Sequence, residues 1–127
     1  MIYPFLIMTI PEATLSNFVN LINREYCKKL VILLPLQSHP NHYHKIKEET
    51  FQILFGRMHL KLEGETRIMY PGDLQTILRE QSHSFSTENG VIFEEVSTTH
   101  MKGDSYYEDS TISESSLELR KTVLDKW

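Results

Sequence analysis

The amino-acid sequence predicts an all-β protein whose short strands form a barrel or a jelly roll. Apolar and polar residues alternate over residues 49–56 and 58–62, which is the pattern of strands that bury one face. Turn residues follow these stretches, with glycine in 63–66, a proline-glycine pair in 70–73, and Asn89-Gly90. Many short strands divided by such turns are typical of closed or two-layered β structures.

Length and composition narrow the possible functions. The 127 residues fit a single domain, 1–127. The net charge of −4, with no basic run, lacks the electrostatic footprint of a nucleic-acid-binding protein, so no nucleic-acid partner is expected. Cys27 is the only cysteine, which excludes an internal disulfide framework and fits a reducing compartment. We therefore expect a cytoplasmic protein in which Cys27 is a small buried hydrophobe.

Residues 1–29 are expected to form an arm followed by a short helix. The opening MIYPFLIMTI lacks a basic start and a cleavage site and is too short to cross a bilayer, so we expect no signal peptide and no membrane partner. Pro4 favours an edge strand or an irregular arm. From Pro11 to Arg24 the spacing of the apolar residues is helical, with Pro11 at the first helical position. These apolar residues are Leu15, Phe18, Val19 and Ile22.

The barrel is expected over about residues 30–100, and it begins with a strand at Leu30–Leu34. This continuous apolar run ends at Pro35, which is typical of a strand buried on both faces. The apolar arm at 1–10 and this two-faced strand both need a cover, and we therefore expect a homodimer.

The strand predicted at 49–56 carries an apolar face made of Phe51, Ile53 and Phe55. We expect this face to line the barrel interior. On the return strand 58–62, His59 alternates with the apolar residues and is expected to be solvated. A further short strand is expected near 74–78.

The second half of the barrel depends on a predicted hairpin at Asn89-Gly90. This dipeptide is a strong hairpin signal between a strand carrying His83 and Phe85 and a strand at Val91–Thr99. A two-residue loop pairs Phe85 with Glu94 and turns Glu94 inward. A three-residue loop turns Glu95 inward instead, because a slip of one residue exchanges the two faces. We expect Glu94 to face inward.

The C-terminal extension, 101–127, is polar at first and regains apolar residues toward its end. Its periodicity fits neither a strand nor a helix cleanly. Leu117, Leu119 and Val123 suit a docked terminal strand, whereas Leu117, Leu124 and Trp127 suit a helix.

The stretch HYHKIKEETFQILFG, residues 42–56, contains the strongest functional pattern in the chain. Strand alternation places His42 and His44 on one face, and a turn at 45–48 would bring Glu49 beside them on the next strand. Two imidazoles and one carboxylate that converge in this way are ligands for a divalent metal ion.

The same stretch resembles the first motif of the cupin superfamily, which reads HxH, three or four residues, Glu, six residues, Gly. His42, His44, Glu49 and Gly56 match it without a gap. The second cupin motif is matched more loosely: Pro71-Gly72-Asp73 stands for the turn, His83 follows ten residues later, and Thr87 replaces the usual asparagine. The resemblance covers about residues 30–100. It implies a cupin double-stranded β-helix, or jelly-roll barrel, with the metal ligands His42, His44, Glu49 and His83.

A narrower resemblance concerns four segments of the chain. They are similar to small cupin modules that occur alone or fused to sialic-acid-type sugar synthases, and loosely similar to cupin sugar isomerases of the D-lyxose type. The segments are NREYCKKLVILLP, HYHKIKEETFQIL, IFEEVSTTH and DSYYED. The resemblance implies a carbohydrate-like small-molecule ligand.

The ligand set suggests how such a protein would work. Three neutral imidazoles and one carboxylate leave a divalent transition metal (Mn, Fe, Ni, Co or Zn) with a net charge near plus one and with open positions for substrate oxygens. Such an ion can polarise a carbonyl group. An aldose-ketose isomerase also needs a base to move a proton between adjacent carbons, and Glu94 is the first candidate, with Glu95 the alternative.

Other residues are weaker candidates for the site. Lys45 or Lys47, at the barrel mouth, could orient a sugar oxygen, although a solvated role is the simpler expectation for surface lysines. Tyr106 and Tyr107 could close over the mouth, with at least one of them packed structurally. His39 and His100 belong to no motif and are assigned to a loop and a strand end, with His39 a possible rim residue.

Three functions remain open at this stage. The first is a metal-dependent enzyme, an aldose-ketose isomerase foremost, acting on a sugar or sugar-acid derivative. The second is a non-catalytic carbohydrate-binding or regulatory module, since fold membership does not fix function. The third is an iron dioxygenase, which uses the same ligand set of three histidines and one glutamate.

Overall fold

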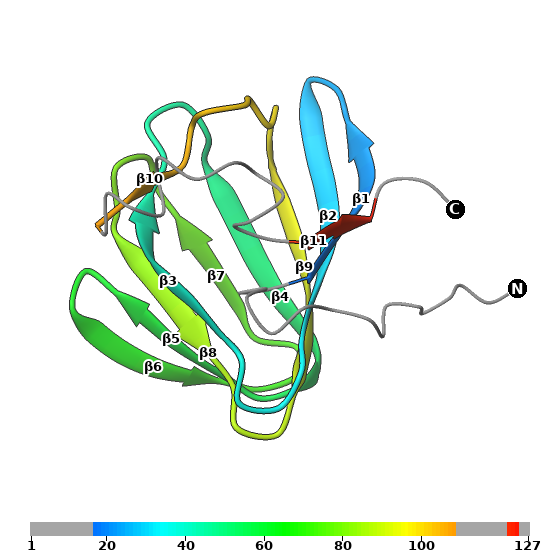
Figure 1. The fold of residues 1–127 in the computed structure, drawn as a ribbon, viewed down its shortest axis with the longest axis vertical. Coiled ribbons are helices and arrows are strands. Elements are labelled where there is room, and N and C mark those ends of the chain that lie inside the picture. The colour runs from blue at the N-terminus through cyan, green and yellow to red at the C-terminus, as the bar shows by residue number, and fades with distance from the viewer. Residues whose placement is uncertain (1–16, 109–121, 125–127) are drawn as a thin grey trace, which may run out of the picture.

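Two β-sheets pack face to face in the structure, a computed structural model that describes residues 17–108 and 122–124 (Figure 1). The described part of the chain contains strands and no helix, and the predicted all-β jelly roll is confirmed. All strand pairs are antiparallel except β1 with β11. The larger sheet has the order β11-β1-β2-β9-β4-β7, and the smaller has the order β10-β3-β8-β5-β6. The strands are β1 Asn17–Asn23, β2 Tyr26–Leu33, β3 Ser38–Tyr43, β4 Glu49–Gly56, β5 Met58–Leu62, β6 Glu65–Met69, β7 Leu74–Ile77, β8 His83–Ser86, β9 Val91–Thr98, β10 Tyr106–Tyr107 and β11 Thr122–Leu124.

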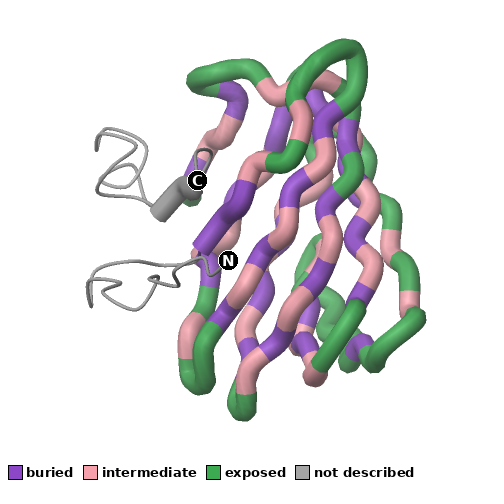
Figure 2. The backbone as a smooth tube through the Cα atoms, turned by 90° about the vertical axis from the view of Figure 1, so that its right-hand side faces the viewer, coloured by how far each residue is buried: buried purple, intermediate pink, exposed green. Residues whose placement is uncertain are grey.

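The inner faces of the two sheets form a layered core. Buried and partly exposed residues alternate along the strands, as expected when one face of each strand points into the barrel (Figure 2). On the larger sheet, Val31, Phe93 and Ile53 are cross-strand neighbours in one apolar layer. The next layer along the same strands holds Lys29 and Glu95 beside Phe51. The barrel is therefore apolar over part of its length and polar toward one end.

Strand β1 replaces the described part of the helix predicted over 11–24. Residues 17–23 pair with β2 on one side and with β11 on the other, and residues 11–16 lie outside the described residues. Phe18 and Val19 are buried, although neighbours in a regular strand point to opposite faces. The helix prediction was wrong here because these apolar residues gain two ladders of backbone hydrogen bonds in the sheet, and tertiary pairing overrides a short periodic pattern. Both sheets thus extend beyond the expected 30–100 segment.

Strand β2 is only partly the two-faced strand that the apolar run predicted. Val31 and Leu33 are fully buried, while Leu30 and Ile32 on the other face are half-buried. Cys27 shares the inner face and is fully buried, as expected.

A bulge in β4 separates Phe55 from the apolar face assigned to it. Ile53 lies opposite Phe93, but Phe55 lies opposite Ile92, so one extra residue has been inserted in β4. Such an insertion exchanges the two faces of the strand beyond it. Phe51 and Ile53 are 1% exposed and Phe55 is 68% exposed, so the predicted three-residue face ends at Ile53.

The hairpin predicted at Asn89-Gly90 is a crossover between the two sheets. β8 pairs with β3 and β5, whereas β9 pairs with β2 and β4, so the two strands share no hydrogen bonds. The register deduced from a two-residue loop therefore does not apply. Glu95 shares the inward face with Phe93 and is 3% exposed, while Glu94 lies on the outer face. The expectation that Glu94 points inward was wrong.

The C-terminal extension returns to both sheets. β10 pairs with β3, placing Tyr107 opposite His42, and β11 runs parallel to β1. Residues 122–124 therefore agree with the strand alternative for the tail, and the rest of 109–127 lies outside the described residues. Within the described residues, no helix has the length and apolar character that a membrane span requires.

Gly56 tests how closely the end of β4 approaches the turn at Asn89-Gly90. It has a φ of 85°, and a β-carbon there would overlap the carbonyl oxygen of Gly90. Gly64 has the same φ of 85° but open space around it. We expect Gly64→Ala to cost about 1 kcal/mol of unfolding free energy, from the left-handed backbone alone. Gly56→Ala should cost at least about 3 kcal/mol, because the strands must also separate. Urea denaturation measures both, and equal losses would contradict the close approach.

Candidate metal centre

The four motif residues converge inside the barrel. One potential ligand atom from each of His42, His44, Glu49 and His83 lies within 4.8 Å of the others, and all four residues are buried. His42 is on β3, opposite His83 on β8, and His44 follows the end of β3. Glu49 is the first residue of β4, which belongs to the facing sheet. It therefore does not lie on a strand next to β3, as the sequence predicted. The turn at 45–48 therefore carries the chain across the barrel, and the cluster lies between the sheets.

Backbone carbonyl groups set the orientation of the three imidazoles. The Nδ1 atoms of His42, His44 and His83 lie 2.9, 2.9 and 3.0 Å from the carbonyl oxygens of Pro40, Asp104 and Gln81. Since a carbonyl oxygen can only accept, each Nδ1 carries the proton. In the neutral ring the lone pair is then on Nε2. Metal-ligating histidines have this arrangement, in which a hydrogen bond from the second nitrogen fixes tautomer and ring orientation.

The polar atoms at the centre of the cluster fit a cation. His83 Nε2 lies 2.9 Å and His44 Nε2 lies 3.3 Å from Glu49 Oε2. With Nδ1 as the donor, a neutral ring has no proton to share in these contacts. Accordingly, both carboxylate oxygens of Glu49 and Nε2 of His83 are buried with no hydrogen-bond partner among the described residues. Buried polar atoms left in this state are costly, and a divalent ion would satisfy them together.

The electrostatic environment favours the forms that bind metal. Burial alone would raise the pKa of Glu49, but the Lys47 ammonium and His44 outweigh it and hold that pKa well below its usual range. Burial, reinforced by the neighbouring His83, lowers the pKa of His42 well below its ordinary value. The cluster therefore presents a carboxylate and a neutral imidazole, as a divalent metal requires.

Lys47 joins the cluster to a second carboxylate. Its ammonium lies 3.3 Å from Glu49 Oε1 and donates to Glu95 Oε1 at 3.0 Å. All three side chains are at most 4% exposed, so the expectation of a solvated lysine was wrong at position 47. Burial by itself lowers the pKa of Lys47. The two carboxylates raise that pKa by a larger amount, so the pKa of Lys47 lies above its usual value. Lys47 is therefore a permanent cation between a candidate ligand and a carboxylate outside the ligand set.

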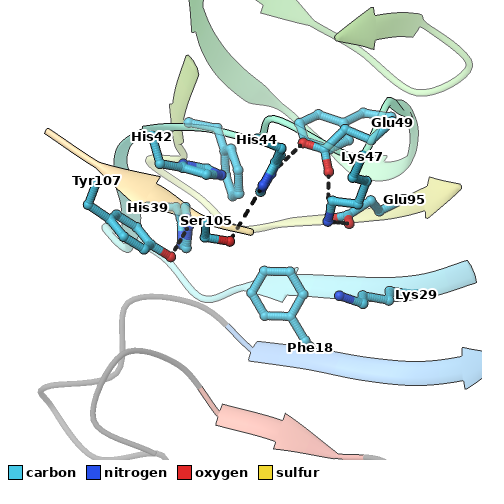
Figure 3. A pocket seen from close by; sticks show the side chains of 12 residues that line it. Phe18, Lys29, His39, His42, His44, Lys47, Glu49, Glu95, Ser105 and Tyr107 are labelled. Atoms are coloured by element: carbon cyan, nitrogen blue, oxygen red, sulfur yellow. Dashed lines mark hydrogen bonds and ion pairs between the residues drawn. The ribbon is translucent and has the colours of Figure 1, made fainter. Parts of the chain in front are cut away.

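These residues surround a small pocket enclosing about 280 Å³ of space, part of it open to solvent (Figure 3). The pocket walls include five of the residues above and five more that the sequence did not assign to the pocket wall. The latter are Phe18, Lys29, His39, Phe85 and Ser105.

His39 reaches the pocket through an irregularity in β3. It is opposite Phe85, whereas His42 is opposite His83, so β3 contains one extra residue between the two histidines. In a regular strand residues three apart point to opposite faces, and the bulge turns both inward. His39 is 3% exposed and its ring stacks on Phe85 with centroids 5.0 Å apart. No motif marks a bulge, so the expectation of a loop or rim position was wrong.

The candidate catalytic residues occupy different positions. Glu95 lines the pocket, whereas Glu94 points outward and forms an ion pair with Lys28 at 3.0 Å. Lys45 is exposed, and its ammonium lies 4.6 Å from the centre of the Tyr106 ring. Tyr106 is half-buried and stacks on Tyr43, away from the walls of the pocket.

Tyr107 follows the expectation of a packed tyrosine. It is 7% exposed, its ring stacks on His42 with centroids 5.3 Å apart, and it lines the pocket. Its hydroxyl lies 3.4 Å from His39 Nε2. Of the two tyrosines, Tyr107 is therefore the one that contacts the site.

Asp104 holds the loop that carries His44. Its carboxylate accepts hydrogen bonds from the backbone N–H groups of Lys45, Ile46 and Lys47 at 2.9 to 3.3 Å. Its own carbonyl oxygen accepts the hydrogen bond from His44 Nδ1. One buried residue thus fixes both the backbone of the loop at 45–48, here called the crossover loop, and the ring of a candidate ligand. Sequence patterns gave no sign of it, because the contact spans about sixty residues of chain.

Asp104→Asn should weaken metal binding. The substitution removes the charge and replaces one acceptor oxygen with a donor that faces backbone N–H groups. We expect the Kd for Zn²⁺ or Mn²⁺, measured by competition with a chromophoric chelator, to rise about 10- to 100-fold. Asp73→Asn is the matched control, because that carboxylate accepts a backbone hydrogen bond from Tyr70 in a surface turn. Equal affinities in both variants would argue against the role of Asp104.

The stability of the metal-free protein should fall as pH falls from 7 toward 5. The pKa of His42 is lower in the folded state, so the unfolded chain binds its proton first, and folding loses stability as pH drops below the ordinary histidine value near 6.5. One such group contributes at most about 1.4 kcal/mol per pH unit. Urea unfolding in chelator at several pH values measures the slope, and His42→Asn should reduce it. A wild-type stability independent of pH over this range would refute the assignment.

Comparisons with known proteins bear on the fold. No protein-family model and no curated protein matches this chain. Solved structures do match it. The Schizosaccharomyces pombe Cnp3 cupin domain is 18% identical, with a TM-score of 0.61, over 65% of this chain and 64% of that one.

Two matched structures are described as enzymes. A sugar phosphate isomerase of the cupin superfamily from Silicibacter pomeroyi is 23% identical, with a TM-score of 0.59, over 68% of this chain and 58% of that one. The polyketide cyclase RemF from Streptomyces resistomycificus is 25% identical, with a TM-score of 0.61, over 68% of this chain and 62% of that one. The chain spans less than two thirds of each of these three proteins. The facing sheets, the buried histidine and glutamate cluster and these similarities agree, and the chain therefore has the cupin fold.

Proposed function

We propose that this protein is a metal-dependent enzyme that isomerises a small sugar or sugar acid. The observation that supports it best is Glu95, a buried carboxylate on the pocket wall that is not part of the candidate ligand set. Because Glu95 is paired with Lys47, it keeps its charge at the pocket wall, where a carboxylate can act as a base. The similarity to a protein described as a sugar phosphate isomerase supports the same reaction class.

Aldose-ketose isomerisation moves a proton between two adjacent carbons, one of which carries a carbonyl group. When bound, the divalent ion would supply Lewis acidity to the substrate oxygens. His42, His44, Glu49 and His83 would hold it. Glu95 accepts the proton from the hydroxyl-bearing carbon next to the carbonyl and returns it to the former carbonyl carbon, while the hydroxyl proton passes to the former carbonyl oxygen, so that the carbonyl group moves to the adjacent carbon. Lys47 orients Glu95 through the 3.0 Å hydrogen bond.

The surroundings of Glu95 suit this role. Phe51 is its cross-strand neighbour on β4, and Phe18 and Phe85 also line the pocket. Apolar walls limit the access of water, which strengthens the electrostatic interactions between Glu95 and a bound substrate.

Glu95→Gln tests the proposed base. Metal-loaded protein is incubated in D₂O with a panel of aldoses, ketoses and sugar acids, and proton NMR follows deuterium uptake at the carbon next to the carbonyl. We expect exchange with at least one compound and a loss of about 10²- to 10⁴-fold in Glu95→Gln, because general base catalysis contributes in this range. Glu94→Gln is the matched control, one residue away on the outer face, and should exchange at the wild-type rate.

Three further measurements on the same protein distinguish the isomerase from the other two functions: sugar binding, oxygen uptake and metal affinity. Binding of a sugar without exchange, unchanged in Glu95→Gln, would contradict the isomerase and favour a carbohydrate-binding module. Oxygen uptake by iron-loaded protein would favour a dioxygenase. The metal Kd of Glu95→Gln must stay near that of the wild type, which separates loss of the base from loss of the ion.

A further inference from the structure

Lys29 is a second buried lysine in the pocket, and the mechanism above does not use it. It lies on the inner face of β2 between Cys27 and Val31, with Glu95 as its direct cross-strand neighbour on β9. The residue is 3% exposed and lines the pocket together with the metal cluster. Figure 3 shows Lys29 and Phe18 on the opposite side of the pocket from His42 and His44.

The partners of Lys29 differ from those of Lys47. The Lys47 ammonium forms ion pairs with two carboxylates. Lys29 forms none with any carboxylate of residues 17–108 or 122–124. Its ammonium forms a hydrogen bond of 3.2 Å with His100 Nδ1 and lies 5.6 Å from the centre of the Phe18 ring. An ammonium group has three N–H donors, and the described residues give Lys29 one hydrogen-bonding acceptor.

Keeping this charge in the barrel is expensive. Burial lowers the pKa of Lys29 although the Coulomb attraction of Glu95 opposes it. An apolar side chain at this position would pack as Val31 and Leu33 do along the same face of β2. A buried cation that lacks a carboxylate partner and borders a pocket is therefore better explained by a ligand than by stability.

The charges around the pocket indicate the sign of that ligand. Lys29 and Lys47 balance Glu49 and Glu95, and an imidazole that binds a metal ion does so in its neutral form. A divalent ion on the cluster would leave the lined pocket with a net charge of plus two. Excess positive charge in a site shielded from water strongly favours an anion over a neutral molecule.

We propose that the substrate carries a carboxylate and that Lys29 receives it, so that the enzyme acts on a sugar acid rather than on a neutral sugar. This inference rests on the proposed function for the reaction, but its binding test does not require turnover. Lys29 and the metal cluster are on opposite sides of the pocket, so one substrate can place its carboxylate at Lys29 and its carbonyl end toward the cluster. Glu95 is adjacent to Lys29, beside the chain of the bound acid.

A carboxylate fits better than a phosphate ester. The described walls of the pocket contain no arginine, and the described residues contain no helix whose N-terminus could bind phosphate. One ammonium on the Lys29 side matches the single charge of a carboxylate.

Calorimetry with matched ligand pairs tests the proposal. Manganese-loaded protein is titrated with D-glucuronate, D-galacturonate and D-mannuronate, and with the three aldoses that share their configurations. We expect at least one acid to bind at least 10-fold more tightly than its aldose, which corresponds to about 1.4 kcal/mol. Lys29→Met should bring this ratio close to one, and Lys29→Arg should preserve most of it because the charge remains.

Lys28→Met is the matched control. Lys28 is the neighbour of Lys29 on β2, but it faces outward and pairs with Glu94. Its removal should leave the ratio of acid to aldose affinities unchanged, while the manganese Kd should be the same in all variants. If Lys29→Met fails to fold, as judged by thermal unfolding, Lys29→Gln takes its place, because it also removes the charge but keeps a polar side chain, and it should likewise bring the ratio close to one.

The outcomes separate this inference from the reaction itself. Acids that bind no better than aldoses, or do not bind, would overturn the inference whatever the exchange experiment shows. An acid preference that survives Lys29→Met would also overturn it. The corresponding aldose 6-phosphates form a third arm, and tighter binding of a phosphate than of the uronate would refute the choice of a carboxylate. A Lys29-dependent acid preference without proton exchange would support the anion site and refute the isomerase.

Discussion

The ammonium group of Lys47, placed between Glu49 and Glu95, is the interaction on which the rest of the site depends. Two carboxylates buried in a small barrel would repel each other and lose their hydration, so neither could remain charged without a cation between them. The burial of Lys47 is possible for the same reason. This three-residue network lets the fold keep one carboxylate for the metal cluster and another at the pocket wall.

The position of Lys47 depends in turn on the crossover loop. Asp104 binds three successive backbone N–H groups of this loop, and the His44 ring is fixed on the same residue. Tyr106 and Tyr107 pair with β3 beyond Asp104 and complete the attachment of the 101–108 segment to the site. Segments about sixty residues apart in the chain are thereby held together, and the candidate ligand His44 is oriented by the same contacts.

The layers of the barrel explain how so many polar groups are tolerated. Val31, Phe93 and Ile53 fill the apolar part of the interior, and the charged residues lie in the layers toward the crossover loop. The apolar layers stabilise the fold. The polar layers form the candidate site, and burying their charged groups lowers the stability of the fold. Buried polar atoms without hydrogen-bond partners, such as the Glu49 oxygens, are expected at functional sites, where function outweighs their cost in stability.

The sequence by itself determined the all-β class, and the resemblance of two of its motifs to those of cupins named the four members of the candidate metal site. Local alternation identifies strands, and the spacing of His42, His44 and Glu49 is a property of one short segment. The tertiary structure decided which glutamate faces inward, because the register of β9 is set by pairing with β2 and β4 and not by the adjacent turn. It also decided that His39 and Lys29 line the pocket, through a bulge in one case and a choice of strand face in the other. Such choices depend on partners distant in the chain, which a local pattern does not contain.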